Sequence, residues 1–161
     1  MENIKDLQTE FSYEKFKERE REEINNLPIY WAFTNRQWNE LLIELGLTKE
    51  NAKEHLCIYL GGIVFKKDIP MIRDILSRLA FMKEAYLENT TSFKEAVIYE
   101  MVNHEYAINW QGDYDVINAL GFKTKYSDGN EIADSNMSEE QKKAYTEVKQ
   151  EYLKKHGHSF F

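Results

Sequence analysis

Hydrophobic residues recur every three or four positions over most of the chain, which is the spacing of one face of an α-helix. The clearest stripe runs through Met71, Ile72, Ile75, Leu76 and Leu79. Stretches with this period cover residues 3–25, 34–45, 68–87, 92–105, 113–120 and 138–153. We therefore predict that helices make up most of the ordered chain.

Three of these stretches begin with the residues that cap helices. Thr34 and Ser138 are each followed by a glutamine three residues later, and Ser92 is followed by Glu95. A hydroxyl at the first position and a carboxylate or amide three residues on can satisfy the free N–H groups of a helix start. The sequence therefore predicts capping boxes at Thr34, Ser92 and Ser138.

Two other stretches lack the helical period and are rich in aromatic and β-branched residues. Residues 29–33 predict a short strand, and the apolar run 56–65 predicts a central strand. Gly61 and Gly62 interrupt that run, which indicates a bulge, a turn or the close approach of another backbone. We expect an α+β fold, with a small sheet of two to three strands packed with about five helices.

The length of 161 residues predicts a single domain over 1–161. Its expected parts are an N-terminal charged helix over 1–26, a core over 28–121, a mobile loop over 122–137, and a C-terminal helix and tail over 138–161. The loop is expected because that segment is polar and contains glycine.

Charge limits the classes of partner. The chain has 21 Lys and Arg against 28 Asp and Glu, a net charge of −7. This balance opposes direct binding to nucleic acid, and the lysines are interleaved with glutamates rather than gathered in a patch.

Cys57 is the one cysteine, which excludes an intrachain disulfide and fits a reducing compartment. No apolar run approaches the roughly 20 residues of a membrane span. We expect a cytoplasmic monomer or weak dimer that does not bind membranes.

The densest group of reactive side chains lies in residues 99–115. Glu100 and His104 are four residues apart, so a helix places them on one face. Glu105 and Asp113 follow closely and would complete three or four metal ligands. A mixed nitrogen and oxygen set suits zinc, manganese or iron more than calcium, and of these we expect zinc rather than manganese or iron. The same residues could instead form a surface ion pair, or a buried polar network that holds the following loop.

Signs of catalysis are weak elsewhere in the sequence. Asp113 and Asp115 are two residues apart and usually diverge, so they are a poor carboxylate pair for hydrolysis. Cys57 and His55 share a strand face but lack a third residue to orient them. The Lys-Ser/Thr of a phosphate-binding loop does not follow Gly62. We predict no catalytic residues and no organic cofactor.

An acidic bias runs through residues 84–115, which hold seven acidic residues and one lysine, Lys94. We expect Glu84, Glu88, Glu95 and Asp115 to present an acidic face to a basic partner protein. The alternatives are an ordinary solvated surface, or acids held by a metal ion.

Several short motifs lie between residues 28 and 121. They are the aromatic run Tyr30–Phe33, Gln37-Trp38, Gly61-Gly62 followed by Lys66-Lys67-Asp68, Tyr99-Glu100 with Asn103-His104-Glu105-Tyr106, Gly112-Asp113, and Asp115 with Ala119-Leu120-Gly121. In these motifs the chain resembles a family of small uncharacterised proteins from phages and mobile elements of Firmicutes. The Asn-His-Glu-Tyr block is the most specific of them. The chain departs from the family pattern at Asn109-Trp110-Gln111 and in its long charged N-terminal helix.

The resemblance implies a phage or prophage origin. For a small acidic phage protein without a catalytic signature, our leading hypothesis is an anti-CRISPR inhibitor. It would cover the basic channel of a CRISPR effector nuclease and block loading of guide or target nucleic acid without turnover. A metal ion at Glu100 and His104 would then be structural. The alternatives are a metal-dependent hydrolase or nuclease that uses Glu100, His104 and Asp113, and a non-enzymatic accessory protein of phage replication.

Overall fold

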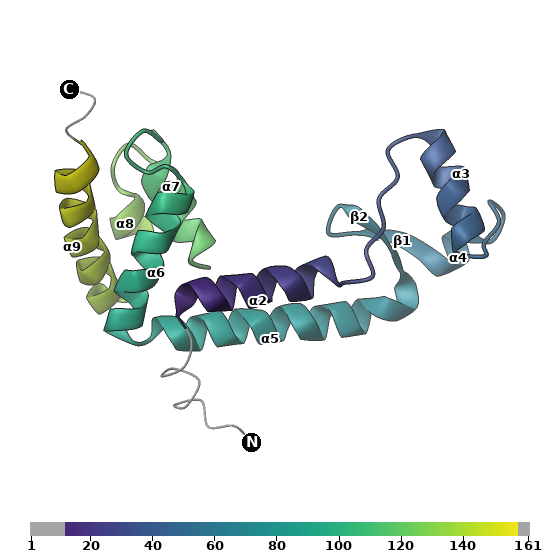
Figure 1. The fold of residues 1–161 in the computed structure, drawn as a ribbon, viewed down its shortest axis with the longest axis horizontal. Coiled ribbons are helices and arrows are strands. Elements are labelled where there is room, and N and C mark those ends of the chain that lie inside the picture. The colour runs from purple at the N-terminus through teal and green to yellow at the C-terminus, as the bar shows by residue number, and fades with distance from the viewer. Residues whose placement is uncertain (1–11, 158–161) are drawn as a thin grey trace, which may run out of the picture. The chain divides into compact units, whose positions relative to one another are not determined.

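A computed structural model describes residues 12–157 of the chain, so the expectations for residues 1–11 and 158–161 lie outside the described residues. The elements in chain order are α2 (Tyr13–Asn25), α3 (Asn35–Glu44), α4 (Ala52–His55), β1 (Leu56–Tyr59), β2 (Gly62–Phe65), the 3₁₀ helix η1 (Lys66–Asp68), α5 (Ile69–Leu87), α6 (Thr90–Asn103), α7 (Gly112–Ala119), α8 (Glu131–Asp134) and α9 (Glu139–His156) (Figure 1). The α+β class is confirmed. The described residues hold eight α-helices rather than about five. Two of the additional helices are the short α4 and α8, which have no periodic stripe of their own.

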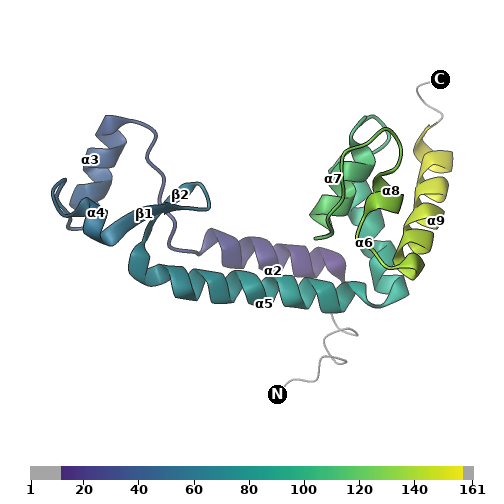
Figure 2. The same cartoon turned by 180° about the vertical axis from the view of Figure 1, so that it is seen from behind.

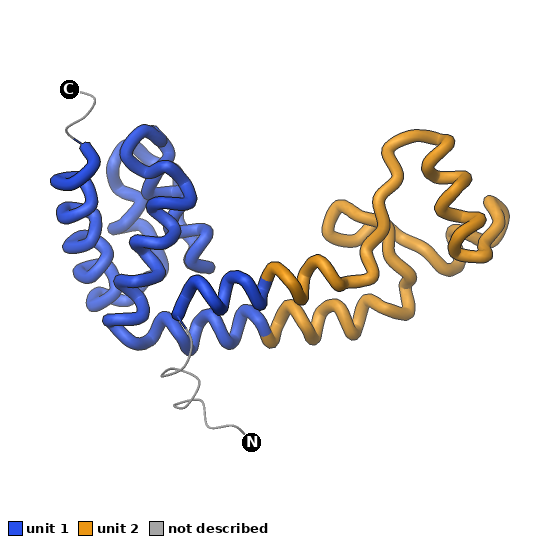
Figure 3. The backbone as a smooth tube through the Cα atoms, viewed as in Figure 1, with its two compact units in different colours: residues 1–20, 79–161 blue, residues 21–78 orange. Residues whose placement is uncertain are grey.

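The described chain divides into two compact units (Figure 3). Unit 1 consists of residues 12–20 and 79–157, and unit 2 consists of residues 21–78. The division falls within α2 and α5. The single domain over 1–161 stays a prediction, because compactness does not show whether each unit folds by itself.

Unit 1 is built on α6, α7, α8 and α9, which lie together in both views of the molecule (Figures 1 and 2). Its core contains Phe93, Val97 and Met101 of α6 with Val116 of α7 and Tyr145 of α9, all fully buried. These positions follow the helical stripes in the sequence. The burial of one face on each helix is therefore what stabilises this unit.

Two helix starts in unit 1 test the predicted caps. Ser138 and Gln141 form the expected capping box at the start of α9. The prediction at Ser92 is wrong, because α6 begins two residues earlier and Asn89 caps it by accepting a hydrogen bond from the Ser92 N–H at 3.0 Å. Both Asn and Ser are good caps, so the sequence did not decide between them.

The apolar run 56–65 in unit 2 is an antiparallel hairpin, and the prediction of one continuous strand is wrong. β1 and β2 pair from Leu56 with Phe65 to Tyr59 with Gly62. Leu60 and Gly61 form the two-residue turn, with φ of 53° and 79°, the left-handed region that such turns require. The third strand expected at 29–33 is reduced to a bridge between Tyr30 and Ile63.

Both faces of this hairpin are covered, which explains why its sequence is apolar throughout. On one face Leu56 and Ile63 pack with Leu41 and Leu42 of α3. On the other face Val64 packs with Leu27 and with Ile72 of α5. A hydrophobic residue is needed at successive positions, so the alternation that marks a half-exposed hairpin is lost.

Gly62 lies against residues 29–31 and leaves no room there for a side chain. A Cβ atom at this position would lie 2.3 Å from Ile29 Cγ2 and 3.3 Å from the Trp31 ring. We expect Gly62→Ala to lower the free energy of unfolding by about 1–3 kcal/mol through overpacking, measured by chemical denaturation.

The matched control for this substitution is Gly157→Ala, where the nearest atom to a new Cβ would be 3.6 Å away. It should change stability by no more than about 0.5 kcal/mol. Equal effects of the two substitutions would show that Ile29 can move aside and that Gly62 is not required.

The segment 122–137 has more structure than its composition predicted. It contains the single-turn helix α8, and Glu131, Ser135 and Met137 are buried. Its mobility stays a prediction.

Between residues 12 and 157, none of the helices is long and apolar enough to cross a membrane.

Candidate functional site

Glu100 is a buried carboxylate at the centre of unit 1. It lies on α6 and is 1% exposed. The Tyr13 hydroxyl donates a hydrogen bond to its Oε1 at 2.9 Å, and His104 Nε2 lies 3.3 Å from its Oε2. The ammonium of Lys17 lies 3.7 Å from Oε1 and offsets the negative charge. Glu100 therefore joins α6 to the first turns of α2.

Lys17 extends this group into a network. Its ammonium also lies 2.9 Å from Glu20 Oε1, and Lys83 lies 3.2 Å from Glu20 Oε2. Burial alone would raise the pKa of Glu20, but the hydrogen bonds and charges of the two lysines outweigh it and the pKa is lowered. At Tyr13, burial and the neighbouring Glu100 charge both raise the pKa, so its hydroxyl keeps the proton that it donates.

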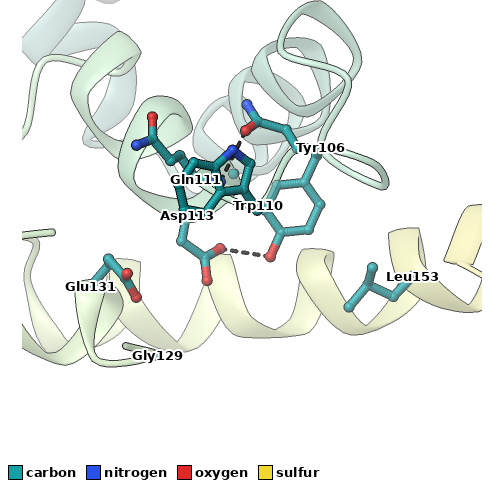
Figure 4. A pocket seen from close by; sticks show the side chains of 9 residues that line it. Tyr106, Trp110, Gln111, Asp113, Gly129, Glu131 and Leu153 are labelled. Carbon is teal, nitrogen blue, oxygen red and sulfur yellow. Dashed lines mark hydrogen bonds between the residues drawn. The ribbon is translucent and has the colours of Figure 1, made fainter. Parts of the chain in front are cut away.

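Asp113 is the centre of a second hydrogen-bond group, at the start of α7. Its Oδ1 accepts a hydrogen bond from the Tyr106 hydroxyl at 2.7 Å (Figure 4). The same oxygen accepts a second hydrogen bond from the Tyr145 hydroxyl at 2.9 Å. Its Oδ2 lies 2.6 Å from the ammonium of Lys149. Burial, followed by the charge of Asp113, raises the pKa of both tyrosines. Three donors thus surround one carboxylate and join the 106–113 segment to α9.

A pocket of about 230 Å³ opens beside Asp113 (Figure 4). Its lining includes Tyr106, Trp110, Gln111, Asp113, Glu131 and Leu153. Trp110 is 84% exposed, and its indole lies edge-on to the Tyr126 ring with 6.3 Å between the ring centroids. The pocket therefore combines two carboxylates with aromatic surface that water can reach.

The predicted metal ligands fall into different groups. Glu100 and His104 come together as their spacing predicted, whereas Asp113 is enclosed by Tyr106, Tyr145 and Lys149. Glu105 is exposed, with φ of 49° just past the end of α6. In residues 12–157, no three His, Cys, Asp or Glu side chains are placed to hold a metal ion. A metal site, with zinc preferred, stays a prediction.

The four acids predicted to face a partner differ in exposure and in hydrogen bonding. Glu84, Glu88 and Glu95 are exposed, and Glu95 accepts a hydrogen bond from the Tyr86 hydroxyl at 3.2 Å. Asp115 instead accepts a hydrogen bond from Asn109 Nδ2 at 2.8 Å, so it holds the loop before α7. The first three remain candidates for an acidic face.

Sequence reasoning did not single out Tyr145, Lys149, Trp110 and Glu131. Tyr145 and Lys149 are four residues apart on α9, and that spacing could have indicated a shared face. Trp110 was noticed only as a departure from the family pattern. No local signal marks Glu131, because its burial depends on how α8 packs against the rest of unit 1.

Comparison with known proteins gives one family. The model of a family of unknown function (DUF7659) matches residues 12–147, which cover most of both units. That range includes Glu100, Asp113 and Glu131. Neither a curated protein nor a solved structure matches the chain. Because the family model spans well over half of the sequence, the chain belongs to the family of unknown function DUF7659.

Proposed function

We propose that this protein acts by binding a basic partner protein and not by catalysing a reaction. More specifically, we propose that it is a phage-derived counter-defence protein that covers a CRISPR effector nuclease in the host cytoplasm and blocks guide or target nucleic-acid loading. The single observation that supports it best is the uneven charge of the two units. The described residues of unit 1 hold 12 Lys and Arg against 17 Asp and Glu, whereas unit 2 holds 8 of each.

The exposed acids of unit 1 add to this support. Glu84, Glu88 and Glu95 make no ion pair with any of the residues 12–157. Their charges are therefore available to a basic surface, and charge complementarity of this kind speeds association and selects the partner.

Metal-dependent hydrolysis has less support in the arrangement of the same side chains. A hydrolytic metal needs ligands that converge on one open position. Glu100 is buried against Tyr13 and Lys17, while Asp113 is held by two tyrosines and a lysine. Both carboxylates are thus occupied in holding helices together.

The proposal is tested by phage infection and by direct binding. We expect the protein to protect phage in a CRISPR-immune host, and to bind the purified effector nuclease more tightly without guide RNA than with it. Replacing Glu84, Glu88 and Glu95 together by lysine should weaken binding by at least about tenfold, with a steeper loss at low salt.

The matched control replaces three exposed acids of unit 2, Glu44, Glu50 and Glu54, by lysine, which changes the net charge by the same amount. Equal weakening by both triple variants would show that net charge alone is responsible and would remove the acidic face from the proposal. The absence of both protection and binding would refute the counter-defence function.

A further inference from the structure

Glu131 is a buried acid without a cation. The residue is 7% exposed and lies at the start of α8. The Ser127 N–H donates to its Oε1 at 3.3 Å, and this is its one side-chain hydrogen bond within the described chain. No Lys, Arg or His between residues 12 and 157 forms an ion pair with it. Within the described residues no buried side-chain oxygen lacks a hydrogen-bond partner, so the second oxygen of Glu131 reaches water. A positive charge that enters from solvent can therefore pair with this largely enclosed carboxylate.

Asp113, the other carboxylate that lines the pocket, has a cation beside it. Asp113 has the ammonium of Lys149 at 2.6 Å and two tyrosine hydroxyls. In the view of Figure 4 its carboxylate lies between Glu131 and the Tyr106 ring. Of the two acids that line the pocket, Glu131 is therefore the one without a cation beside it in residues 12–157.

We propose that this pocket receives the charged end of one lysine or arginine side chain of a partner protein, with its ammonium or guanidinium group against Glu131. A partner protein as the source of this side chain rests on the proposed function, whereas the affinity of the pocket for an alkyl cation does not.

The other lining groups suit such a ligand. The Trp110 indole and the Tyr106 ring offer aromatic surface to a cation, which is attracted to ring faces within about 6 Å. Leu153 gives apolar contact for a methylene stem. The volume of about 230 Å³ is below the range of about 300–1,000 Å³ usual for cofactors and drug-sized ligands. One side-chain end is therefore a better match in size than an organic cofactor.

The test titrates the full-length protein with small probes and follows the Trp110 indole N–H by NMR. The cations are n-butylamine and n-propylguanidine, and the uncharged match is 1-butanol. We expect saturable shifts with both cations, with Kd of about 1 mM or weaker, and none with butanol. Glu131→Gln should weaken cation binding by at least about tenfold, since it removes the charge and keeps the shape.

Glu105→Gln is the matched control, because it removes one exposed negative charge from a neighbouring position that does not line the pocket. It should change affinity by less than about twofold. If Glu131→Gln does not fold, Trp110→Ala replaces it, with the Gly129 amide as the probe. Trp110 is 84% exposed, so its loss should spare the fold and weaken cation binding.

Two further ligands separate the possible sources of the cation. N-acetyl-lysine-N-methylamide represents a lysine in a partner, and putrescine represents a free amine. Binding of the blocked lysine at least as tight as that of putrescine supports a partner side chain, and tighter binding of putrescine overturns that source.

Three results would refute cation binding at Glu131 in this pocket. They are the absence of saturable shifts, equal binding of butanol, and unchanged affinity in Glu131→Gln. Cation binding without capture of an effector nuclease would sustain the pocket and refute the counter-defence function.

Discussion

Asp113→Ala is expected to lower the free energy of unfolding by about 3–5 kcal/mol, a large part of the stability of a small domain. The substitution removes the acceptor of the Tyr106 and Tyr145 hydroxyls and the counter-charge of Lys149. Tyr145 is fully buried and Tyr106 is 8% exposed, so water cannot easily replace the lost hydrogen bonds. Lys149 is partly exposed and can turn toward solvent. Loss of its ion pair therefore lowers the free energy of unfolding less than loss of the two tyrosine hydrogen bonds.

The measurement is urea denaturation followed by circular dichroism, with Asp115→Ala as the matched control. Asp115 lies on the same helix, but among residues 12–157 it accepts a side-chain hydrogen bond from Asn109 alone. Its replacement should cost about 1 kcal/mol. If the two substitutions cost the same, the convergence of three donors on Asp113 contributes nothing beyond one ordinary hydrogen bond.

Local spacing was sufficient to predict one half of the Glu100 group. Glu100 and His104 are adjacent on one helix face because they are four residues apart, and the structure places them in contact. Tyr13, however, lies 87 positions from Glu100 along the chain. Contacts of that kind depend on how α2 packs against α6, which no periodicity within either helix can indicate.

The hairpin at 56–65 shows the opposite difficulty. Its apolar composition predicts β-structure, which the hairpin confirms. Because both faces of the hairpin are covered, the alternation of apolar and polar residues that would locate the turn is missing. Gly61 and Gly62 were the local signal. Gly61 adopts a positive φ in the turn, and Gly62 makes room for Ile29. The sequence offered a turn and a close approach as alternatives, and both occur at successive residues.

The polar neighbours of Glu131 predict that it lies in a mobile loop. Polar residues are common both in solvated loops and around buried charged groups, so composition does not separate the two cases. What distinguishes them here is the burial of Glu131 beside the Asp113 group, and that depends on the packing of α8 and α9.

Raising the pH above 10 is expected to destabilise the protein steeply, by about 3 kcal/mol between pH 10 and pH 11. Burial, and then the charges of Glu100 or Asp113, raise the pKa of Tyr13, Tyr106 and Tyr145 above the ordinary value of 10.0. In the unfolded chain these tyrosines ionise near pH 10, whereas in the folded chain they keep their protons. The stabilisation is therefore complete below pH 10 and is lost as the pH rises, because the unfolded state then binds fewer protons.

Urea denaturation at pH 8, 10 and 11 measures this loss, and Tyr145→Phe isolates one tyrosine. The variant should be less stable at pH 8 but should lose about 1 kcal/mol less than the wild type between pH 10 and 11. Gly62→Ala provides the control, since it lowers stability without removing a tyrosine and should keep the full pH dependence. The wild type and both variants carry the same lysines, so the comparison between them isolates the tyrosine. A pH dependence unchanged by Tyr145→Phe would therefore mean that the Tyr145 hydroxyl ionises in the folded chain as readily as in water, against its position beside Asp113 in the core.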